Sequence, residues 1–372
     1  MFTTGDRVQY LHGIPGNNPH IPQYPTLIPH RDAMTKPIEV LITLPFSDAL
    51  IKQLSEVSPR LHIHAVVARK VDEITPDLWA QVEVLYTNRV FPSPEQAPHL
   101  TWIQAHWAGI DHALDAPILQ RPGLIVTSLS GASAPQMAEH AVMMLLALGH
   151  HLPEAFQHQR RAEWPTGRWE LFSPTELRGS TVGIVGYGSV GRQIARLLRT
   201  FDAIVLATKR DVMHPEDTGY TLEGMGDAAG DLVHRLYPPQ ALRSMLRLCD
   251  FVVVCMPRTP ATLNLVGAEE LAALKPGACL VDISRGGIVD HNALVPLLRD
   301  RRLAGAALDV FPIEPLSVDS PLWKLPNVII TPHIAGFSVH YDQRAANLFA
   351  ENLHRYLAGL PLYNRVQLDI GY

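Results

Sequence analysis

Three short segments in the last quarter of the chain carry side chains that together could reduce a carbonyl group. Arg285 lies in a glycine-rich loop, Glu314 lies within residues 309–316, and His333 lies within residues 331–336. Arginine stays charged and can bind both oxygens of a carboxylate, and histidine donates a proton near neutral pH. A carboxylate beside the imidazole holds it and favours its protonated form. We therefore predict that these three residues are catalytic and act on a 2-oxo acid, although each alone could be an ordinary surface or strand-end residue.

A glycine-rich loop precedes these segments in the chain. Residues 186–191 read G-Y-G-S-V-G and lie between an apolar run and a segment with apolar residues at helical spacing. This order of strand, G-x-G-x-x-G turn and helix is typical of a dinucleotide-binding loop, whereas the glycines alone could form a turn without a ligand. The free N–H groups of such a helix end bind phosphates. The predicted cofactor-binding residues of this loop are Gly186, Tyr187, Gly188, Ser189, Val190 and Gly191.

The strand after this loop ends in Lys209 and Arg210. In NAD enzymes this place, about twenty residues beyond the glycines, usually holds an acidic residue that binds the ribose hydroxyls. Two cations would instead bind the 2′-phosphate of NADP. We therefore predict NADP as the preferred cofactor and NAD as the alternative, although both residues could also form a solvated basic strand end.

The composition argues against several other classes of protein. The chain has 372 residues, 47% of them hydrophobic, and a net charge of −5. A chain of this length is expected to form about two domains. Its negative net charge argues against binding to nucleic acid or to an acidic lipid surface, because both require a basic surface. The longest apolar run, residues 141–148, is too short to span a bilayer, and residues 1–10 lack a secretory signal. Three cysteines without paired spacing indicate reduced thiols and a cytoplasmic location. No group of histidines has the spacing of metal ligands, so no metal is predicted.

Short apolar runs alternate with helical or irregular segments along two parts of the chain, which predicts βαβ units and two parallel sheets. The first series comprises residues 38–44, 62–67, 82–87, 100–104 and 124–127, and the second comprises 181–185, 203–207, 251–255, 278–283, 303–308 and 328–330. A helix that is apolar nearly all round, residues 135–148, should be buried. The other segments are predicted as an extended arm (1–36), a connection between domains (151–178), a flexible solvated loop (211–239) and a final amphipathic helix that returns to the first domain (340–357).

With these motifs, residues 38–368 resemble the D-isomer-specific 2-hydroxyacid dehydrogenase family. Beyond the glycine loop, the resemblance lies in residues 252–262, 274–278, 284–290, 308–316 and 331–336. It implies an α/β fold with two doubly wound parallel-sheet domains and the active site in the cleft between them. The flavodoxin-like substrate domain would comprise residues 1–150 and 334–372, and the Rossmann cofactor domain residues 151–333. A homodimer is implied as well, and glyoxylate or hydroxypyruvate is the first candidate substrate.

The resemblance also implies roles for individual residues. His333 would be the acid and base, Glu314 would pair with it, and Arg285 would bind the substrate carboxylate and carbonyl. The backbone N–H groups of Ala108 and Gly109 would hold the same carboxylate. Asp309 would hold the nicotinamide carboxamide. The residues that would line the cofactor are Met256, Pro257, Thr262, Ile283, Asp309 and His333.

Some features separate this chain from relatives with other functions. Formate dehydrogenases of the family have Gln in place of Glu314, and phosphite oxidation is disfavoured because residues 107–109 include no lysine. Asp282 stands where the family more often has Asn. The same scaffold also serves nucleotide-sensing corepressors that bind peptides and can retain all three reacting residues. Such a binding protein is the alternative to an enzyme.

Overall fold

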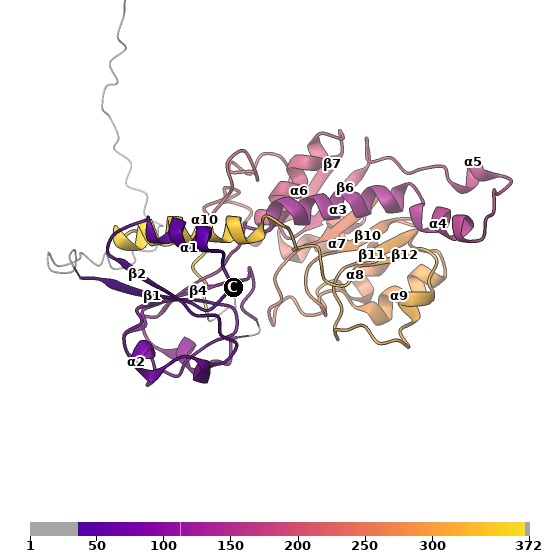
Figure 1. Cartoon of the computed structure of the whole chain (residues 1–372). Helices are drawn as coiled ribbons and strands as arrows, with labels where there is room; N and C mark the ends of the chain where they lie inside the picture. Colours follow the sequence, from indigo (N-terminus) through magenta and orange to yellow (C-terminus); the bar gives the residue numbers. More distant parts are fainter. Residues whose placement is uncertain (1–35, 112, 369–372) are drawn as a thin grey trace, which may run out of the picture. The chain divides into compact units, whose positions relative to one another are not determined.

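The computed structural model describes residues 36–111 and 113–368. The arm predicted for residues 1–36 therefore lies, except for Lys36, outside the described residues. The rest of the chain contains two separate parallel sheets with helices between their strands (Figure 1). The predicted α/β fold with two doubly wound parallel sheets is confirmed.

The first sheet has five parallel strands in the order β2-β1-β3-β4-β5. This is the flavodoxin-like order, which is typical of a doubly wound sheet. The central strands β3 and β4 are buried at every residue, because helices cover both faces of the sheet. The elements of this part are β1 (Ile38–Ile42), α1 (Asp48–Ser55), β2 (Leu61–Ala65), η2 (Val71–Glu73), α2 (Pro76–Trp79), β3 (Val84–Thr87), β4 (Trp102–Ala105), η3 (Pro117–Gln120) and β5 (Ile125–Thr127).

The second sheet has seven parallel strands in the order β12-β11-β10-β9-β6-β7-β8. The strand order reverses between β6 and β9, which is the Rossmann arrangement, and ligands of such sheets bind outside the carboxyl ends of the strands near that point. The predicted runs each contribute a strand: β6 (Thr181–Val185), β7 (Ile204–Thr208), β9 (Phe251–Val254), β10 (Cys279–Asp282), β11 (Gly305–Leu308) and β12 (Val328–Ile330).

The helices of the remaining chain are mostly short. Within residues 36–111 and 113–368, no helix is long and apolar enough to cross a membrane. The helices after β5 are α3 (Ala134–Gly149), α4 (Leu152–Arg160), α5 (Arg168–Leu171), α6 (Ser189–Arg199), η4 (Pro239–Ala241), α7 (Leu242–Leu246), α8 (Ala268–Ala273), α9 (His291–Arg299), η5 (Pro321–Lys324) and α10 (Tyr341–Leu357).

Helix α3 packs on the second sheet, although it precedes that sheet in the chain. Its residues Ala141 and Leu145 share a core with Val182 and Phe251 of the sheet, and α3 lies beside α6 (Figure 1). Helix α10 packs on the first sheet instead. Its residue Phe349 is buried among strands of that sheet, and α10 lies beside α1 (Figure 1). The chain therefore returns to its first sheet after completing the second.

The prediction of a solvated loop for residues 211–239 is wrong for the last part of this range, whereas residues 211–234 are irregular and mostly exposed or half-buried. Residues Arg235–Tyr237 form an additional strand, β8, at the edge of the second sheet. The preceding segment, which we call the insert (residues 211–234), contains the buried residues Gly226 and Asp227. Buried side chains of α6 bind this segment, and the composition of a glycine-rich and acidic stretch does not reveal such partners.

The packing of α10 predicts that truncating its central aromatic residue destabilises the protein. Phe349 is fully buried, and its ring centroid lies 4.8 Å from that of Tyr86 and 5.3 Å from that of Trp102. We expect Phe349→Ala to cost about 3–5 kcal/mol of unfolding free energy, measured by urea denaturation. His354→Ala, an exposed change on the same helix, is the control. Equal stability of the two variants would contradict the packing of α10 described above.

Candidate active site

The three predicted catalytic residues follow three neighbouring strands of the second sheet. Strands β10, β11 and β12 lie side by side, and parallel strands present their carboxyl ends at one edge of a sheet. Arg285 follows β10, Glu314 follows β11 and His333 follows β12. The sheet order therefore brings together side chains that are distant in sequence.

His333 and Glu314 are in direct contact. Nδ1 of His333 lies 2.8 Å from Oε2 of Glu314, and both side chains are partly exposed. The other oxygen of Glu314, Oε1, accepts the backbone N–H of Phe311 at 2.9 Å, which fixes the carboxylate. Because Glu314 engages Nδ1, the other ring nitrogen, Nε2, is the one that can face a reacting oxygen.

The turn that carries His333 is held by the buried carboxylate of Asp309. Oδ1 of Asp309 accepts the hydroxyl of Thr331 at 2.6 Å and the N–H of Ile334 at 2.9 Å, and Oδ2 accepts the N–H of Ala335 at 2.9 Å. His333 has a φ of 54°, a left-handed conformation that is unfavourable for residues other than glycine. Hydrogen bonds to a buried charge are strong, so Asp309 offsets the cost of this conformation.

Arg285 lies beside the loop predicted to bind the substrate carboxylate. This loop, with Ala108 and Gly109, follows β4 of the first sheet. A Cβ atom at Gly109 would lie only 3.3 Å from Nη2 of Arg285. The guanidinium is oriented by Asp111, whose Oδ1 lies 3.9 Å from Nε, and by the carbonyl of Ser284, which accepts from Nη1 at 2.9 Å. A small carboxylate could therefore contact Arg285 and the glycine backbone together.

The glycine loop has the shape of a dinucleotide cradle. Gly186 has a φ of 110°, and a Cβ atom at Gly191 would lie 2.2 Å from the carbonyl oxygen of Gly186, so both positions require glycine. A Cβ atom at Gly188 would meet nothing within 4 Å, which leaves space for a ligand. Helix α6 begins at Ser189, and the first N–H groups of a helix, here including that of Val190, are available to phosphate oxygens. These residues fit a dinucleotide.

The other predicted cofactor-lining residues lie at the ends of the neighbouring strands. Met256 follows β9 and packs against Gly186. The hydroxyl of Thr262 donates to the carbonyl of Pro257 at 2.8 Å and fixes the turn after β9. Ile283 is buried at the end of β10. These side chains and the glycine loop thus border the point where the strand order reverses.

On the side of the glycine loop away from β9, the chain lies beside the insert. The predicted cofactor residues there are Tyr187, Lys209 and Arg210. Tyr187 is buried, and its hydroxyl donates to Asp227 at 2.5 Å. Lys209 is half-buried, and its ammonium donates to backbone carbonyls of the insert, whereas Arg210 is exposed. The predicted cofactor residues of this region therefore contact a segment whose structure was not predicted.

Several residues that hold the site were not predicted from the sequence. Asp111 orients Arg285 from the first sheet, and Arg192 and Asp227 connect α6 to the insert. The G-x-G-x-x-G pattern ends before position 192, and Asp227 lies in a stretch that resembles a loop. A metal was not expected, and in the described part of the chain no three His, Cys, Asp or Glu residues are grouped so that they could bind one.

A dinucleotide cradle in a Rossmann sheet, with an Arg-Glu-His set beside it, defines the class of nicotinamide-dependent oxidoreductases. A family model described as D-isomer specific 2-hydroxyacid dehydrogenase, NAD binding domain, matches residues 142–335. The chain belongs to the D-isomer specific 2-hydroxyacid dehydrogenase family, whose enzymes act on the CH–OH group of their donors with NAD or NADP.

Individual relatives agree with this assignment. The chain is 34% identical over 267 residues to a glyoxylate reductase of Thermofilum pendens, covering 71% of this chain and 74% of the relative. It is 29% identical over 333 residues to a D-3-phosphoglycerate dehydrogenase of Archaeoglobus fulgidus, covering 89% of this chain but 59% of that longer relative. A crystal structure of a D-isomer specific 2-hydroxyacid dehydrogenase from Xanthobacter autotrophicus Py2, in complex with NADPH and MES, matches with a TM-score of 0.72 and 29% identity over 91% of this chain and 100% of that one. These matches give no support to a nucleotide-sensing corepressor.

Asp282, which precedes the loop of Arg285, is a carboxyl group in an unusual environment. It is 1% exposed; its Oδ1 accepts the N–H of Ser284 at 3.0 Å and the hydroxyl of Ser284 at 2.5 Å. Its Oδ2 is buried and has no hydrogen-bond partner among the described residues. Burial, together with the nearby charge of Asp309, raises the pKa of Asp282 to about 7.

This raised pKa predicts a pH-dependent effect of Asp282→Asn. The folded protein holds a proton on Asp282 that the unfolded chain releases at lower pH, so this group's contribution to stability falls as the pH rises from about 4 to about 7. The uncharged variant lacks this loss. We expect its stability relative to the wild type to rise by about 2–3 kcal/mol between pH 5 and pH 8, measured by urea denaturation. Exposed Asp319→Asn is the control, and a pH-independent difference for Asp282→Asn would contradict the assignment.

Proposed function

We propose that this dehydrogenase reduces a small 2-oxo acid to the 2-hydroxy acid and that Arg285, His333 and Glu314 carry the reaction. The observation that supports this most strongly is the contact of His333 Nδ1 with Glu314, together with the guanidinium of Arg285 beside Gly109. One side of the site then holds a carboxylate and the other side holds a proton donor. Reduction of a 2-oxo acid requires this pair of functions.

Each residue has a defined task in this reaction. Arg285 and the N–H groups of Ala108 and Gly109 bind the carboxylate, and Arg285 also polarises the carbonyl. Nε2 of His333 donates a proton to the carbonyl oxygen, and Glu314 holds the imidazole for this transfer. The bound nicotinamide supplies the hydride. Asp309, whose two oxygens accept three hydrogen bonds from the turn of His333, retains capacity to accept one more from the nicotinamide carboxamide.

We propose NADP as the preferred cofactor. Gly186, Gly188, Ser189, Val190 and Gly191 would bind the pyrophosphate, and Lys209 and Arg210 would bind the 2′-phosphate, because a cation rather than an acid follows β7. The relative from Xanthobacter autotrophicus Py2, which was crystallised with NADPH, supports the same preference. The remaining lining residues border the same strand ends: Tyr187, Met256, Pro257, Thr262 and Ile283.

We propose glyoxylate or hydroxypyruvate as substrates, in line with the glyoxylate reductase of Thermofilum pendens. The first sheet with α10 would form the substrate domain, and the second sheet the cofactor domain. Because α3 packs on the second sheet, we place the boundary expected after residue 150 before α3 instead. The substrate would lie in the cleft between the two domains, where Gly109 faces Arg285. A cytoplasmic location is proposed because Cys249, Cys255 and Cys279 are all free thiols.

An absorbance assay at 340 nm tests the reaction and the cofactor together. Glyoxylate, hydroxypyruvate, pyruvate and longer 2-oxo acids are each offered with NADPH and with NADH. We expect oxidation of the nicotinamide with a short acid and faster turnover with NADPH. Preference for NADH would overturn the cofactor assignment alone. No turnover by a folded protein that binds nucleotide would overturn the reaction.

Removal of the proposed proton donor tests its role. His333→Ala should lower turnover about a hundredfold or more at neutral pH, because a positioned acid contributes that much to proton transfer. His99→Ala, at an exposed position on the first domain, should leave turnover unchanged. Near-normal turnover of His333→Ala would exclude His333 as the acid.

We propose that the protein is a homodimer that associates through the segment from α3 to α5. This continuous stretch of the chain carries several large exposed apolar residues, and exposed apolar surface of this kind marks interaction sites when it is contiguous. These residues are between 40% and 84% exposed: Met143, Leu152, Phe156, Trp164, Trp169 and Leu171.

A charged residue in this segment should dissociate the dimer. Light scattering after size exclusion should give twice the chain mass of 41.1 kDa for the wild type and the single mass for Phe156→Asp, because an unpaired charge in an apolar interface is costly. Leu248→Asp replaces an exposed leucine elsewhere and should leave the dimer intact. A monomeric wild type, or a dimeric Phe156→Asp, would contradict this interface.

A further inference from the structure

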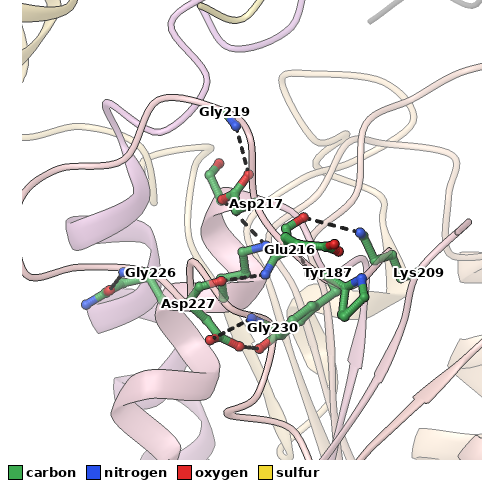
Figure 2. A network of polar contacts seen from close by, with 12 residues as sticks. Tyr187, Lys209, Glu216, Asp217, Gly219, Gly226, Asp227 and Gly230 are labelled. Atoms are coloured by element: carbon green, nitrogen blue, oxygen red, sulfur yellow. Dashed lines mark hydrogen bonds and ion pairs between the residues drawn. The ribbon is translucent and has the colours of Figure 1, made fainter. Parts of the chain in front are cut away.

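The insert is bound to the glycine loop through the buried carboxylate of Asp227, which contacts Tyr187 (Figure 2). Asp227 is 3% exposed; its Oδ2 accepts the hydroxyl of Tyr187 at 2.5 Å and the N–H of Leu232 at 3.0 Å. Its Oδ1 accepts the N–H groups of Gly230 at 3.0 Å and of the next residue at 3.2 Å. Burial opposes the ionisation of Asp227, but these hydrogen bonds outweigh burial and keep its pKa below the usual value. A buried, charged group thus organises the insert.

Arg192 holds the same segment from α6. Its side chain is 2% exposed, and its guanidinium donates to the carbonyl of Asp227 from Nη1 at 2.6 Å and to the carbonyl of Pro215 from Nη2 at 2.5 Å. Its Nε lies 3.5 Å from the carboxylate of Asp217, and its Cζ lies 4.7 Å from the ring centroid of Tyr187. Arg192 therefore fixes the position of Pro215 relative to the glycine loop.

Lys209 is attached to the two residues on either side of Pro215. Its ammonium donates to the carbonyl of His214 and, at 3.5 Å, to the carbonyl of Glu216 (Figure 2). Both acceptors are neutral backbone carbonyl oxygens. Burial and the nearby charge of Arg192 lower the pKa of Lys209, and more distant acids, including Asp211, act in the opposite direction. An ammonium has three donors, so Lys209 is fixed in place while its charge and at least one donor remain for a ligand.

We propose that Asp227 and Arg192 are positioning residues that fix Lys209, through residues 214–216, for the 2′-phosphate of NADP. This inference rests on the cofactor preference proposed above. A free lysine side chain loses rotamer entropy when it is immobilised. Since the insert already holds the ammonium, that loss occurs on folding rather than on binding. NAD has no 2′-phosphate, so the insert favours NADP over NAD.

Binding titrations of the intact protein test this chain of contacts without relying on turnover. The dissociation constants of NADPH and NADH are measured by fluorescence for the wild type, Asp227→Asn, Lys209→Met and the double variant. The matched control is Asp231→Asn, which makes the same change four residues away at an exposed side chain. The quantity compared is the ratio of the NADH to the NADPH dissociation constant.

We expect Lys209→Met to lower this ratio by roughly tenfold or more, because a charge-assisted hydrogen bond contributes about 1.5–3 kcal/mol. Asp227→Asn should lower the ratio about three- to tenfold, a part of the Lys209 effect, mainly by weakening NADPH. In the double variant the ratio should equal that of Lys209→Met alone, because Asp227 acts through Lys209. Asp231→Asn should resemble the wild type.

Other results would overturn the inference. Three results with a wild type that prefers NADPH would show that Asp227 does not act through Lys209. Asp227→Asn could keep the wild-type ratio, or it could weaken the binding of NADPH and NADH equally. In the double variant, the effect of Asp227→Asn on the ratio could add in full to that of Lys209→Met. If the wild type prefers NADH, the NADP assignment fails first and the inference falls with it. Should Asp227→Asn fail to fold, Tyr187→Phe removes only the hydroxyl that donates to Asp227, and the same lowered ratio is expected.

Discussion

The buried carboxylate of Asp309 is the interaction on which the geometry of the active site depends. It accepts hydrogen bonds from Thr331, Ile334 and Ala335, which surround His333 on both sides. These hydrogen bonds hold the backbone of His333 in a left-handed conformation, and Nδ1 of its imidazole lies against Glu314. Asp309 comes directly after β11, and the loop that it holds follows the neighbouring strand β12. The order of the sheet thus determines where the proposed acid lies.

The two sheets contribute different parts of the site. The second sheet supplies Arg285, Glu314 and His333 together with the glycine loop, all at the carboxyl ends of its strands. The first sheet supplies the loop with Gly109, where the absence of a side chain lets the guanidinium of Arg285 approach. Because α10 returns to the first sheet, both ends of the described chain belong to the same part of the molecule, and the second sheet is inserted between them.

Periodicity and turn chemistry were sufficient to predict the two parallel sheets, since each apolar run became a strand. The contact between His333 and Glu314 was predictable because each residue follows a strand, and parallel strands end at one edge of the sheet. The insert was not predictable in the same way. Its glycines and acids are typical of a solvated loop, whereas its order comes from Arg192 and Tyr187, which lie distant in sequence. A buried arginine on a helix has no signature in the sequence, because exposed arginines show the same spacing.

Transfer of deuterium from a reduced cofactor that carries deuterium at both positions of the nicotinamide C4 tests the central claim most directly. The 2-hydroxy acid formed from hydroxypyruvate is analysed by NMR for deuterium at C2, with the wild type and with His333→Ala at equal protein concentration. We expect the wild type to place the label at C2 and His333→Ala to form the labelled acid at least about a hundredfold more slowly. An unlabelled product, or equal transfer by both proteins, would contradict the assignment of His333 and its partners as the site of reduction.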